Sequence, residues 1–362
     1  LKAFLRSYYF VMKLFPVQSH KIIFLSRQAD RPSLDFEMLK KALLEQNPDL
    51  NIVFLCKTMK WQPLHILSFF GMTLRQLYHL ATSPVCVLDS YCIPVSLCTH
   101  RKRLRIIQIW HAMGAIKQFG WQNLLKEAGR GEKLSRRMHM HRGYTSIRSG
   151  SAAMVPIFRE AFGADESGFF VESLPRIDLL AHNAQELREG LRAHLPGLAG
   201  KKLLLYVPTF RRGQDVHIHR LTDAVDPRQY HIIIRGHPLF GKEENHYLTL
   251  PEVSTLELLT AADVIVTDYS AIAFEAAVLD IPLYFFLYDY EDYRRKTGVN
   301  LDLYEEMPHA VFEDANTLMD AVAHTPYDFD ALHRFRETYV VNTRGDATQR
   351  LARYILTGKE PE

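Results

Sequence analysis

The sequence has few cysteines and no long uncharged apolar run, and both absences narrow what the chain can be. The four cysteines form no C-x-x-C pair, and no Cys/His spacing is typical of a zinc site. We therefore expect buried, reduced thiols. No stretch of 18 apolar residues lacks a charge, so no transmembrane helix is expected. No secretion signal is recognisable either.

An excess of charge of one sign is also missing. The net charge is only +3, and no nucleic-acid-binding module is recognisable, so we expect no nucleic acid partner. Arginine and lysine nevertheless gather in two clusters, over 101–105 and 130–142. Such clusters are typical of a solvated surface, but they could also face anionic lipid head groups or an anionic polymer.

Length and composition predict two α/β domains. At 362 residues the chain is too long for one ordinary core. Short apolar runs alternate with helical patterns, which favours parallel sheets with helices on both faces. The expected strands are 22–26, 52–56, 85–88, 105–110, 169–172, 203–207, 230–235, 264–267 and 283–286. Two such domains place a ligand cleft between them, at the carboxyl ends of the strands.

The helical patterns also suggest where the domains divide. The expected helices are 34–46, 73–81, 153–162, 255–262 and 270–279. A polar helical stretch at about 180–195 ends at Pro196 and Gly197 and is the preferred linker. We therefore expect an N-terminal segment over 1–20, a first domain over 21–180 and a second domain over 181–362.

The first fifteen residues are rich in aromatics, with three cations spaced among them. Drawn as a helix, they present a broad apolar surface flanked by positive charge, and Pro16 ends that helix. Two interpretations stay open: the segment lies on a membrane surface, or it packs on the protein's own core.

Two histidines come directly after predicted strands. His111 precedes a small turn that contains Gly114, and Lys117 follows six residues later, where it could neutralise charge. A neutral imidazole in that place can accept a proton near neutral pH. His237 lies before Pro238, which holds it in an extended conformation. Either histidine could instead be structural.

Two other strand ends carry groups that suit a phosphate. One strand ends at Thr267, and Asp268 or Ser270 can cap the helix that follows. The first N–H groups of such a helix and its partial positive charge favour an anion. In an earlier loop, Arg211 and Arg212 could hold a pyrophosphate through several N–H donors. Singly, these are an ordinary capped helix and two exposed arginines.

In this order, the segments resemble the CDP-glycerol glycerophosphotransferase family, the teichoic-acid primases and polymerases. The matching stretches are 110–117 (WHAMGAIK), 174–178 (LPRID), 206–211 (YVPTFR), 237–238 (HP), 267–270 (TDYS), 286–293 (FLYDYEDY) and 344–348 (RGDAT). The resemblance extends from about Lys21 to Ile355, which is nearly the whole chain.

The resemblance implies two Rossmann-like domains in a GT-B arrangement, with the acceptor on the first and a CDP-polyol on the second. It implies that His111 is the general base and that His237 is the second catalytic residue, at the donor phosphates. The donor phosphates would also be bound by Arg211, Thr267, Asp268 and Ser270. Acceptor binding or structural support would come from Trp110, Gly114, Lys117, Arg176 and Asp178.

The reaction implied is in-line attack by an acceptor hydroxyl on the distal phosphorus of CDP-glycerol or CDP-ribitol, with CMP leaving. The acceptor would be a teichoic-acid-like or capsular polymer, or a lipid-linked precursor. No carboxylate cluster suggests a metal, so we predict no metal and no other cofactor. We expect a cytoplasmic enzyme, peripheral on the inner face of the cell membrane.

Departures from the family pattern leave the polyol and the acceptor open. The first motif reads Trp-His-Ala rather than Trp-His-Gly, Arg235-Gly236 precedes His237, and Ala271 stands where a second Ser or Thr is frequent. One alternative is a GT-B glycosyltransferase that uses a nucleotide sugar, which donor analysis separates. Another is a non-catalytic relative that binds polymers at the membrane surface, which the presence of both histidines disfavours.

Overall fold

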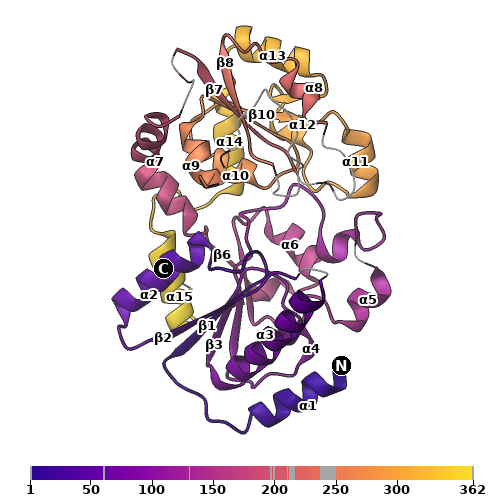
Figure 1. Ribbon diagram of the computed structural model, residues 1–362, viewed down its shortest axis with the longest axis vertical. Helices are drawn as coiled ribbons and strands as arrows, with labels where there is room; N and C mark the ends of the chain where they lie inside the picture. Colours follow the sequence, from indigo (N-terminus) through magenta and orange to yellow (C-terminus); the bar gives the residue numbers. More distant parts are fainter. Residues whose placement is uncertain are drawn as a thin grey trace.

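The computed structural model describes residues 2–59, 62–129, 131–195, 198, 200–209, 211, 217–236, 250 and 252–360. Within these residues the chain forms two lobes, each built on a parallel sheet (Figure 1). This confirms the prediction of an α/β fold with two parallel sheets. The prediction for His237 lies outside the described residues.

The first lobe holds a six-stranded sheet in the order β2-β1-β3-β4-β5-β6. Its strands are β1 (Lys21–Ser26), β2 (Asn51–Cys56), β3 (Val85–Leu88), β4 (Arg105–Gln108), β5 (Ser146–Ser149) and β6 (Phe169–Val171). Its helices are α1 (Lys2–Met12), α2 (Leu34–Gln46), α3 (Pro63–Thr82), α4 (Ile93–Leu97), α5 (Glu132–Arg137) and α6 (Val155–Phe162), with 3-10 turns at Gly120–Asn123 and Glu166–Gly168.

The second lobe holds a five-stranded sheet in the order β11-β10-β9-β7-β8. Its strands are β7 (Lys202–Val207), β8 (Tyr230–Ile234), β9 (Val264–Thr267), β10 (Leu283–Phe286) and β11 (Val311–Phe312). Its helices are α8 (His219–Thr222), α9 (Thr255–Ala261), α10 (Ile272–Ala276), α11 (Tyr290–Lys296), α12 (Leu303–Glu306), α13 (Ala315–His324) and α14 (Phe329–Tyr339).

Strand β1 explains why helices cover both faces of the first sheet. All six of its residues are buried. Ile22 and Phe24 point into the core shared with α2, whereas Ile23 and Leu25 point into the core shared with α1 and α3. Because successive side chains of a strand point to opposite faces, a continuous apolar run is what a sheet covered on both faces requires.

The structure adds two strands and changes several element ends. All nine predicted strands form, but β5 and β11 were not predicted, and the run predicted over 105–110 ends at Gln108. Helix α3 begins ten residues earlier than predicted, at Pro63 rather than 73, and α10 is shorter than the predicted 270–279. Strand β5 reads Ser-Ile-Arg-Ser, so its buried arginine hides it from an apolar pattern.

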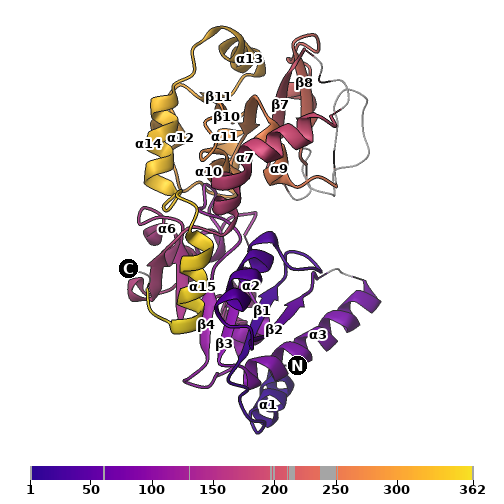
Figure 2. The ribbon, with the colours of Figure 1, turned by 90° about the vertical axis from the view of Figure 1, so that its left-hand side faces the viewer.

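Two helices join the lobes. The boundary expected at residue 180 falls inside α7 (Arg176–Arg192). Helix α15 (Ala347–Thr357), which the predicted division places in the second domain, lies beside α2 of the first lobe (Figures 1 and 2). It is held there because the Tyr354 ring stacks on Phe170 at 4.0 Å and the Arg105 guanidinium donates to the Tyr354 carbonyl at 3.1 Å.

Helix α1 lies against α3 at the end of the first lobe away from the second (Figures 1 and 2). Leu5 and Tyr9 are buried in the core beneath it. Phe10 and Leu14, however, are 66% and 77% exposed. The helix therefore packs on the protein's own core and still presents an apolar surface outward. None of the helices in the described part of the chain is long and apolar enough to cross a membrane.

Candidate active site

A cavity of about 740 Å³ lies between the lobes, where the carboxyl ends of strands from both sheets meet. We call it the cleft. From the first lobe it is lined by His111 and Lys117, and from the second by Arg211, Asp289 and Tyr293, among others. The two sides are tied by backbone bonds, because Gln118 N–H donates to the Gly298 carbonyl at 3.0 Å. Asn300 N–H likewise donates to the Ile116 carbonyl at 2.7 Å.

The turn after β4 holds Trp110 in a conformation that non-glycine residues rarely adopt. Its φ is +59°, which lies in the left-handed region and costs on the order of 1–3 kcal/mol. Its indole ring packs on the His111 ring at 4.2 Å and stacks on Phe119 at 4.9 Å. The left-handed residue turns the chain sharply, so the next residue, His111, lines the cleft.

Arg148 of β5 supports this turn from beneath. It is fully buried, and its guanidinium donates to the carbonyls of Ile109, Ala112 and Glu172, each at 2.7 Å. Two of these carbonyls flank the Trp110-His111 pair. Burial lowers the pKa of Arg148 to about 10, so the side chain is still charged at neutral pH. Arg148 is thus a positioning residue that the sequence analysis missed.

Two contacts of His111 Nδ1 bear on its tautomer. Nδ1 lies 2.8 Å from the main-chain carbonyl of Asp89, which can only accept, and 3.1 Å from the side-chain amide of Gln28, which can present either its N–H or its oxygen. The shorter contact, to the group that can only accept, assigns the proton to Nδ1. Nε2 is then left with a free lone pair. Burial lowers the pKa of His111 to about 4, and the positive charges of Arg176 and Lys117 add to this, while the bond to Asp89 opposes it. The ring is therefore neutral at physiological pH and able to accept a proton.

Lys117 is a cation that lines the cleft. Its main chain forms a bridge with Val299, which fixes its position between the lobes. Its ammonium group has no hydrogen bond or ion pair with any residue that the structure describes. Burial lowers its pKa, partly offset by the carboxylate of Asp268. An unpaired, half-buried ammonium group is strongly stabilised by an anionic ligand.

Arg211, by contrast, is already paired. Its guanidinium donates to Asp268 at 2.9 Å and to both carboxylate oxygens of Asp289, at 2.9 and 3.1 Å. It lies over the rings of Tyr269, Tyr288 and Tyr293 at 5.2–5.7 Å. Most of its N–H donors are used inside the protein, so only a small part of the fork is left for a pyrophosphate.

The predicted phosphate-binding helix start is built differently from the expectation. Asp268 accepts hydrogen bonds from Thr209 as well as Arg211, and Thr267 donates its hydroxyl to the Val207 carbonyl at 2.8 Å. Ser270 precedes α10, which has only five residues, and its hydroxyl accepts a long bond from Ile272 N–H at 3.4 Å. Asp268, Thr267 and Ser270 are not among the residues that line the cleft. Their donor-binding role stays a prediction.

The remaining predicted residues connect the lobes. Arg176 bridges Asp35 of the first lobe and Glu275 of the second, as an ion pair that is mostly buried. Asp178 accepts from the N–H groups of residues 347 and 348, at 3.0 and 2.8 Å, and so caps α15. A Cβ atom at Gly114 would lie 2.7 Å from the Phe274 ring of the second lobe, so this close approach requires glycine. These contacts are structural, and a role of the three residues in acceptor binding stays a prediction.

The model of one family, CDP-Glycerol:Poly(glycerophosphate) glycerophosphotransferase, matches residues 7–357. The chain belongs to this family. Membership confirms the resemblance predicted from the sequence and the prediction of a glycerophosphotransferase-type enzyme.

Relatives of this family member include enzymes for two polyols. The chain is 29% identical to a teichoic acid ribitol-phosphate primase of Bacillus spizizenii, over 96% of this chain and 94% of that protein. It is 24% identical to a teichoic acid glycerol-phosphate primase of Bacillus subtilis, over 87% of this chain and 81% of that protein.

Solved structures share the fold at low sequence identity. The wall teichoic acid polymerase TagF superposes with a TM-score of 0.75 at 19% identity, covering 97% of this chain and 92% of that chain. A UDP-GlcNAc 2-epimerase from Neisseria meningitidis superposes with a TM-score of 0.56 at 11% identity, covering 93% and 99%. These likenesses confirm the predicted GT-B arrangement of two Rossmann-like domains.

Metal-ligating side chains were looked for only where the structure describes this glycerophosphotransferase. Across the described ranges, no group of three or more His, Cys, Asp or Glu residues could hold a metal ion. The positive charge that faces the cleft comes instead from side chains such as Lys117 and Arg211.

Proposed function

We propose that the chain transfers a polyol phosphate from a CDP-activated donor to a hydroxyl of a teichoic-acid-like or capsular acceptor, polymeric or lipid-linked, and releases CMP. One observation carries the proposal. In a member of this family, a histidine and a lysine lie in the same interdomain cleft, and among the described residues neither the Nε2 of the histidine nor the ammonium group of the lysine has a partner. A base for the acceptor and a cation for the donor are the two groups that such a transfer needs.

His111 acts as the general base. Its Nε2 takes the proton of the acceptor hydroxyl as the hydroxyl oxygen forms a bond to the distal phosphorus of the donor. The bond from that phosphorus to the bridging oxygen breaks, and CMP leaves with the electron pair. Because Asp89 and Trp110 hold the ring from two sides, the base is oriented before substrate binds.

Lys117 acts on the donor phosphates. An ammonium group near the bridging oxygens stabilises the negative charge that develops as CMP leaves. Arg211 contributes mainly by orienting Asp289 and the tyrosines around it, since its donors are largely used. His237, from outside the described residues, is the predicted second contact to the phosphates. The proposal includes no metal, and activity is expected to persist in excess EDTA.

The deciding experiment measures CMP release from CDP-glycerol and CDP-ribitol, with and without a lipid-linked acceptor analogue. Both donors are tested because relatives of both kinds match this chain. Acceptor-dependent CMP from one of them is the expected result. In Lys117→Gln, the KM for the donor rises about 10-fold to 100-fold, the loss of one charge-assisted bond. Lys102→Gln, at an exposed site of the first lobe, is the matched control and leaves KM unchanged.

Two outcomes would contradict the proposal. Release of UDP or another nucleotide from a sugar donor, without CMP from either CDP-polyol, indicates the glycosyltransferase alternative. No turnover of any donor, with the polymer still bound, indicates the non-catalytic alternative.

We further propose that the enzyme docks on the membrane surface through α1 and the start of α3. Phe10 and Leu14 are exposed on and just after α1, and Leu64 of α3 is 81% exposed. Phe4 stacks on Phe70 at 6.1 Å, so the two helices form one apolar surface. Lys2 and other cations of α1 flank it and suit anionic head groups.

A Phe10→Glu/Leu14→Glu double variant is expected to bind vesicles rich in phosphatidylglycerol at least about tenfold more weakly, because it loses apolar burial and gains repulsion. The measurement is vesicle co-sedimentation. Leu125→Glu is the matched control, since Leu125 is 88% exposed elsewhere on the first lobe. Equal loss of binding in both variants, or unchanged binding in the double variant, would rule this surface out.

A further inference from the structure

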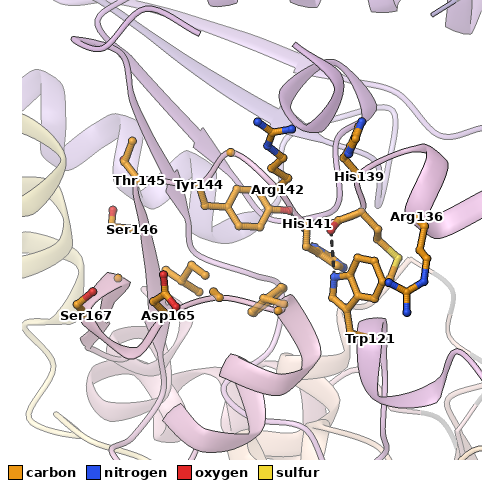
Figure 3. A pocket seen from close by; sticks show the side chains of 17 residues that line it. Trp121, Arg136, His139, His141, Arg142, Tyr144, Thr145, Ser146, Asp165 and Ser167 are labelled. Atoms are coloured by element: carbon orange, nitrogen blue, oxygen red, sulfur yellow. Dashed lines mark hydrogen bonds between the residues drawn. The ribbon is translucent and has the colours of Figure 1, made fainter. Parts of the chain in front are cut away.

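A second cavity, of about 600 Å³, lies in the first lobe beside the cleft. We call it the side pocket; Figure 3 shows the residues that line it. Met140 and His141 line both the side pocket and the cleft, so the two cavities adjoin at this segment. Neither the proposed binding of the donor phosphates nor the role of His111 as general base requires this second cavity.

Positive charge gathers on one side of the side pocket. Arg142 and His139 lie together there (Figure 3), and Lys2 Nζ of α1 lies 3.0 Å from His139 Nε2. Neither Arg142 nor Lys2 has an ion pair within the described ranges. Burial lowers the pKa of His139, and the neighbouring positive charges of Lys2, Arg142 and Arg6 lower it further.

The rest of the pocket is mainly aromatic and polar, apart from Arg136, which pairs with Glu132 and lies over the Trp121 ring at 5.8 Å (Figure 3). Trp121, Tyr144 and Phe162 supply aromatic surface, and Trp121 is fixed because its Nε1–H donates to the Met140 carbonyl at 3.1 Å. Asp165 and Ser146 lie across the pocket from the cations (Figure 3). A carboxylate and hydroxyl groups next to aromatic rings suit a ligand that has both apolar faces and hydroxyl groups.

The backbone of this wall is strained. His139 and His141 have φ values of +48° and +61°, in the left-handed region. For non-glycine residues this costs on the order of 1–3 kcal/mol each, and such residues cluster at ligand sites. The bonds from Met140 N–H to the Ser135 carbonyl and from Arg142 N–H to the His139 carbonyl, both at 3.0 Å, hold the segment in place.

We propose that the side pocket binds a glycosyl phosphate, with its phosphate at Arg142 and His139 and its sugar ring against Trp121 and Tyr144. Arginine recognises phosphate through paired N–H donors. Asp165, on the far wall, accepts hydrogen bonds from the sugar hydroxyls and lies away from the phosphate. The glycosyl phosphate can bind in the side pocket without a CDP-linked donor in the cleft and without any transfer reaction.

Resting on the proposed function, the ligand is the head of a lipid-linked acceptor. Its phosphate lies beside Lys2, on the helix that we place at the membrane. Its sugar lies beside His141, whose other side faces the cleft that contains His111. The pocket thus connects the membrane surface to the base.

The test is titration calorimetry with saturating CDP present, so that the donor site is filled. The probes are the 1-phosphates of glucose, galactose and N-acetylglucosamine, with inorganic phosphate and free glucose for comparison. At least one hexose 1-phosphate is expected to bind about tenfold or more tightly than either comparison ligand. Arg142→Gln weakens that binding about tenfold or more, whereas Lys133→Gln, exposed on the neighbouring α5, leaves it unchanged. In turnover, Arg142→Gln raises the acceptor KM and leaves the donor KM alone.

Absence of binding by all three hexose 1-phosphates would overturn the inference, as would binding that CDP displaces or that Arg142→Gln leaves intact. Calorimetry does not depend on turnover. If the binding is found but no donor yields CMP, the proposed function fails and the side pocket stands. If CMP is released but nothing binds here, the reverse holds.

Discussion

Replacing His111 with asparagine is expected to lower kcat by about 10³-fold and to leave the fold intact. A positioned general base contributes on the order of 10²–10⁴ to the rate. Asparagine preserves the polar contact to the Asp89 carbonyl but supplies no lone pair in place of Nε2. CMP release measures the rate, and circular dichroism checks the fold. His309→Asn, at an exposed site of the second lobe, is the matched control and keeps full activity.

The pH dependence of the rate is a second, independent test of His111 as the general base. Because the base must be unprotonated, kcat/KM falls as the pH drops through the pKa of the free enzyme, about 4 for His111. Donor phosphates favour the imidazolium, so the acid limb of kcat is displaced to higher pH than that of kcat/KM. An inflection near pH 7 would report Asp89, whose pKa burial raises to about 7, and Asp89→Asn removes it. An acid limb that persists in residual His111→Asn activity would assign the base elsewhere.

Replacing Arg148 with methionine is expected to lower the free energy of unfolding by about 3–5 kcal/mol, the cost of breaking a buried charged network. Methionine fills similar space but leaves the carbonyls of Ile109, Ala112 and Glu172 without donors. Urea denaturation measures the change. Because the turn that carries His111 loses its support, kcat also falls in the protein that remains folded.

The matched control is Arg159→Met, because Arg159 forms only an exposed ion pair with Glu166. Its expected change is within about 1 kcal/mol. Arg148→Lys separates charge from geometry, since an ammonium group cannot span three carbonyls and restores only part of the stability. Full stability and full activity in Arg148→Met would show that the turn needs no support from β5.

Much of the fold could be read from local pattern. Each of the nine runs predicted as strands became one, because buried parallel strands need apolar side chains on both faces. Strand β5 was not predicted, because its buried charge is stabilised by hydrogen bonds to carbonyls that are distant in the sequence, and no local pattern records them. Helix α15 was not assigned to the first lobe for the same reason, because the residues that it contacts, in α2 and at Phe170 and Arg105, are distant in the sequence.

In the candidate site, too, local features could be predicted from the sequence and features that depend on distant residues could not. The positions of His111 and Lys117 followed from the strand before them and from their spacing, and both line the cleft. Whether a cation is free to bind substrate could not be predicted from the sequence, because it depends on which carboxylates the fold brings close to that cation. Arg211 meets Asp268 and Asp289 from two other strand ends, while Lys117 meets no partner among the described residues.

By itself, then, the sequence determined the α/β class, the two sheets, the family and the position of His111 and Lys117 just after a strand. These depend on apolar periodicity and on short motifs, which are local. Only the tertiary structure decided the tautomer of His111, the pairing of Arg211, the support from Arg148 and the side pocket beside the cleft. Each of these joins residues far apart in the chain, because charge, burial and hydrogen bonding depend on distance in space.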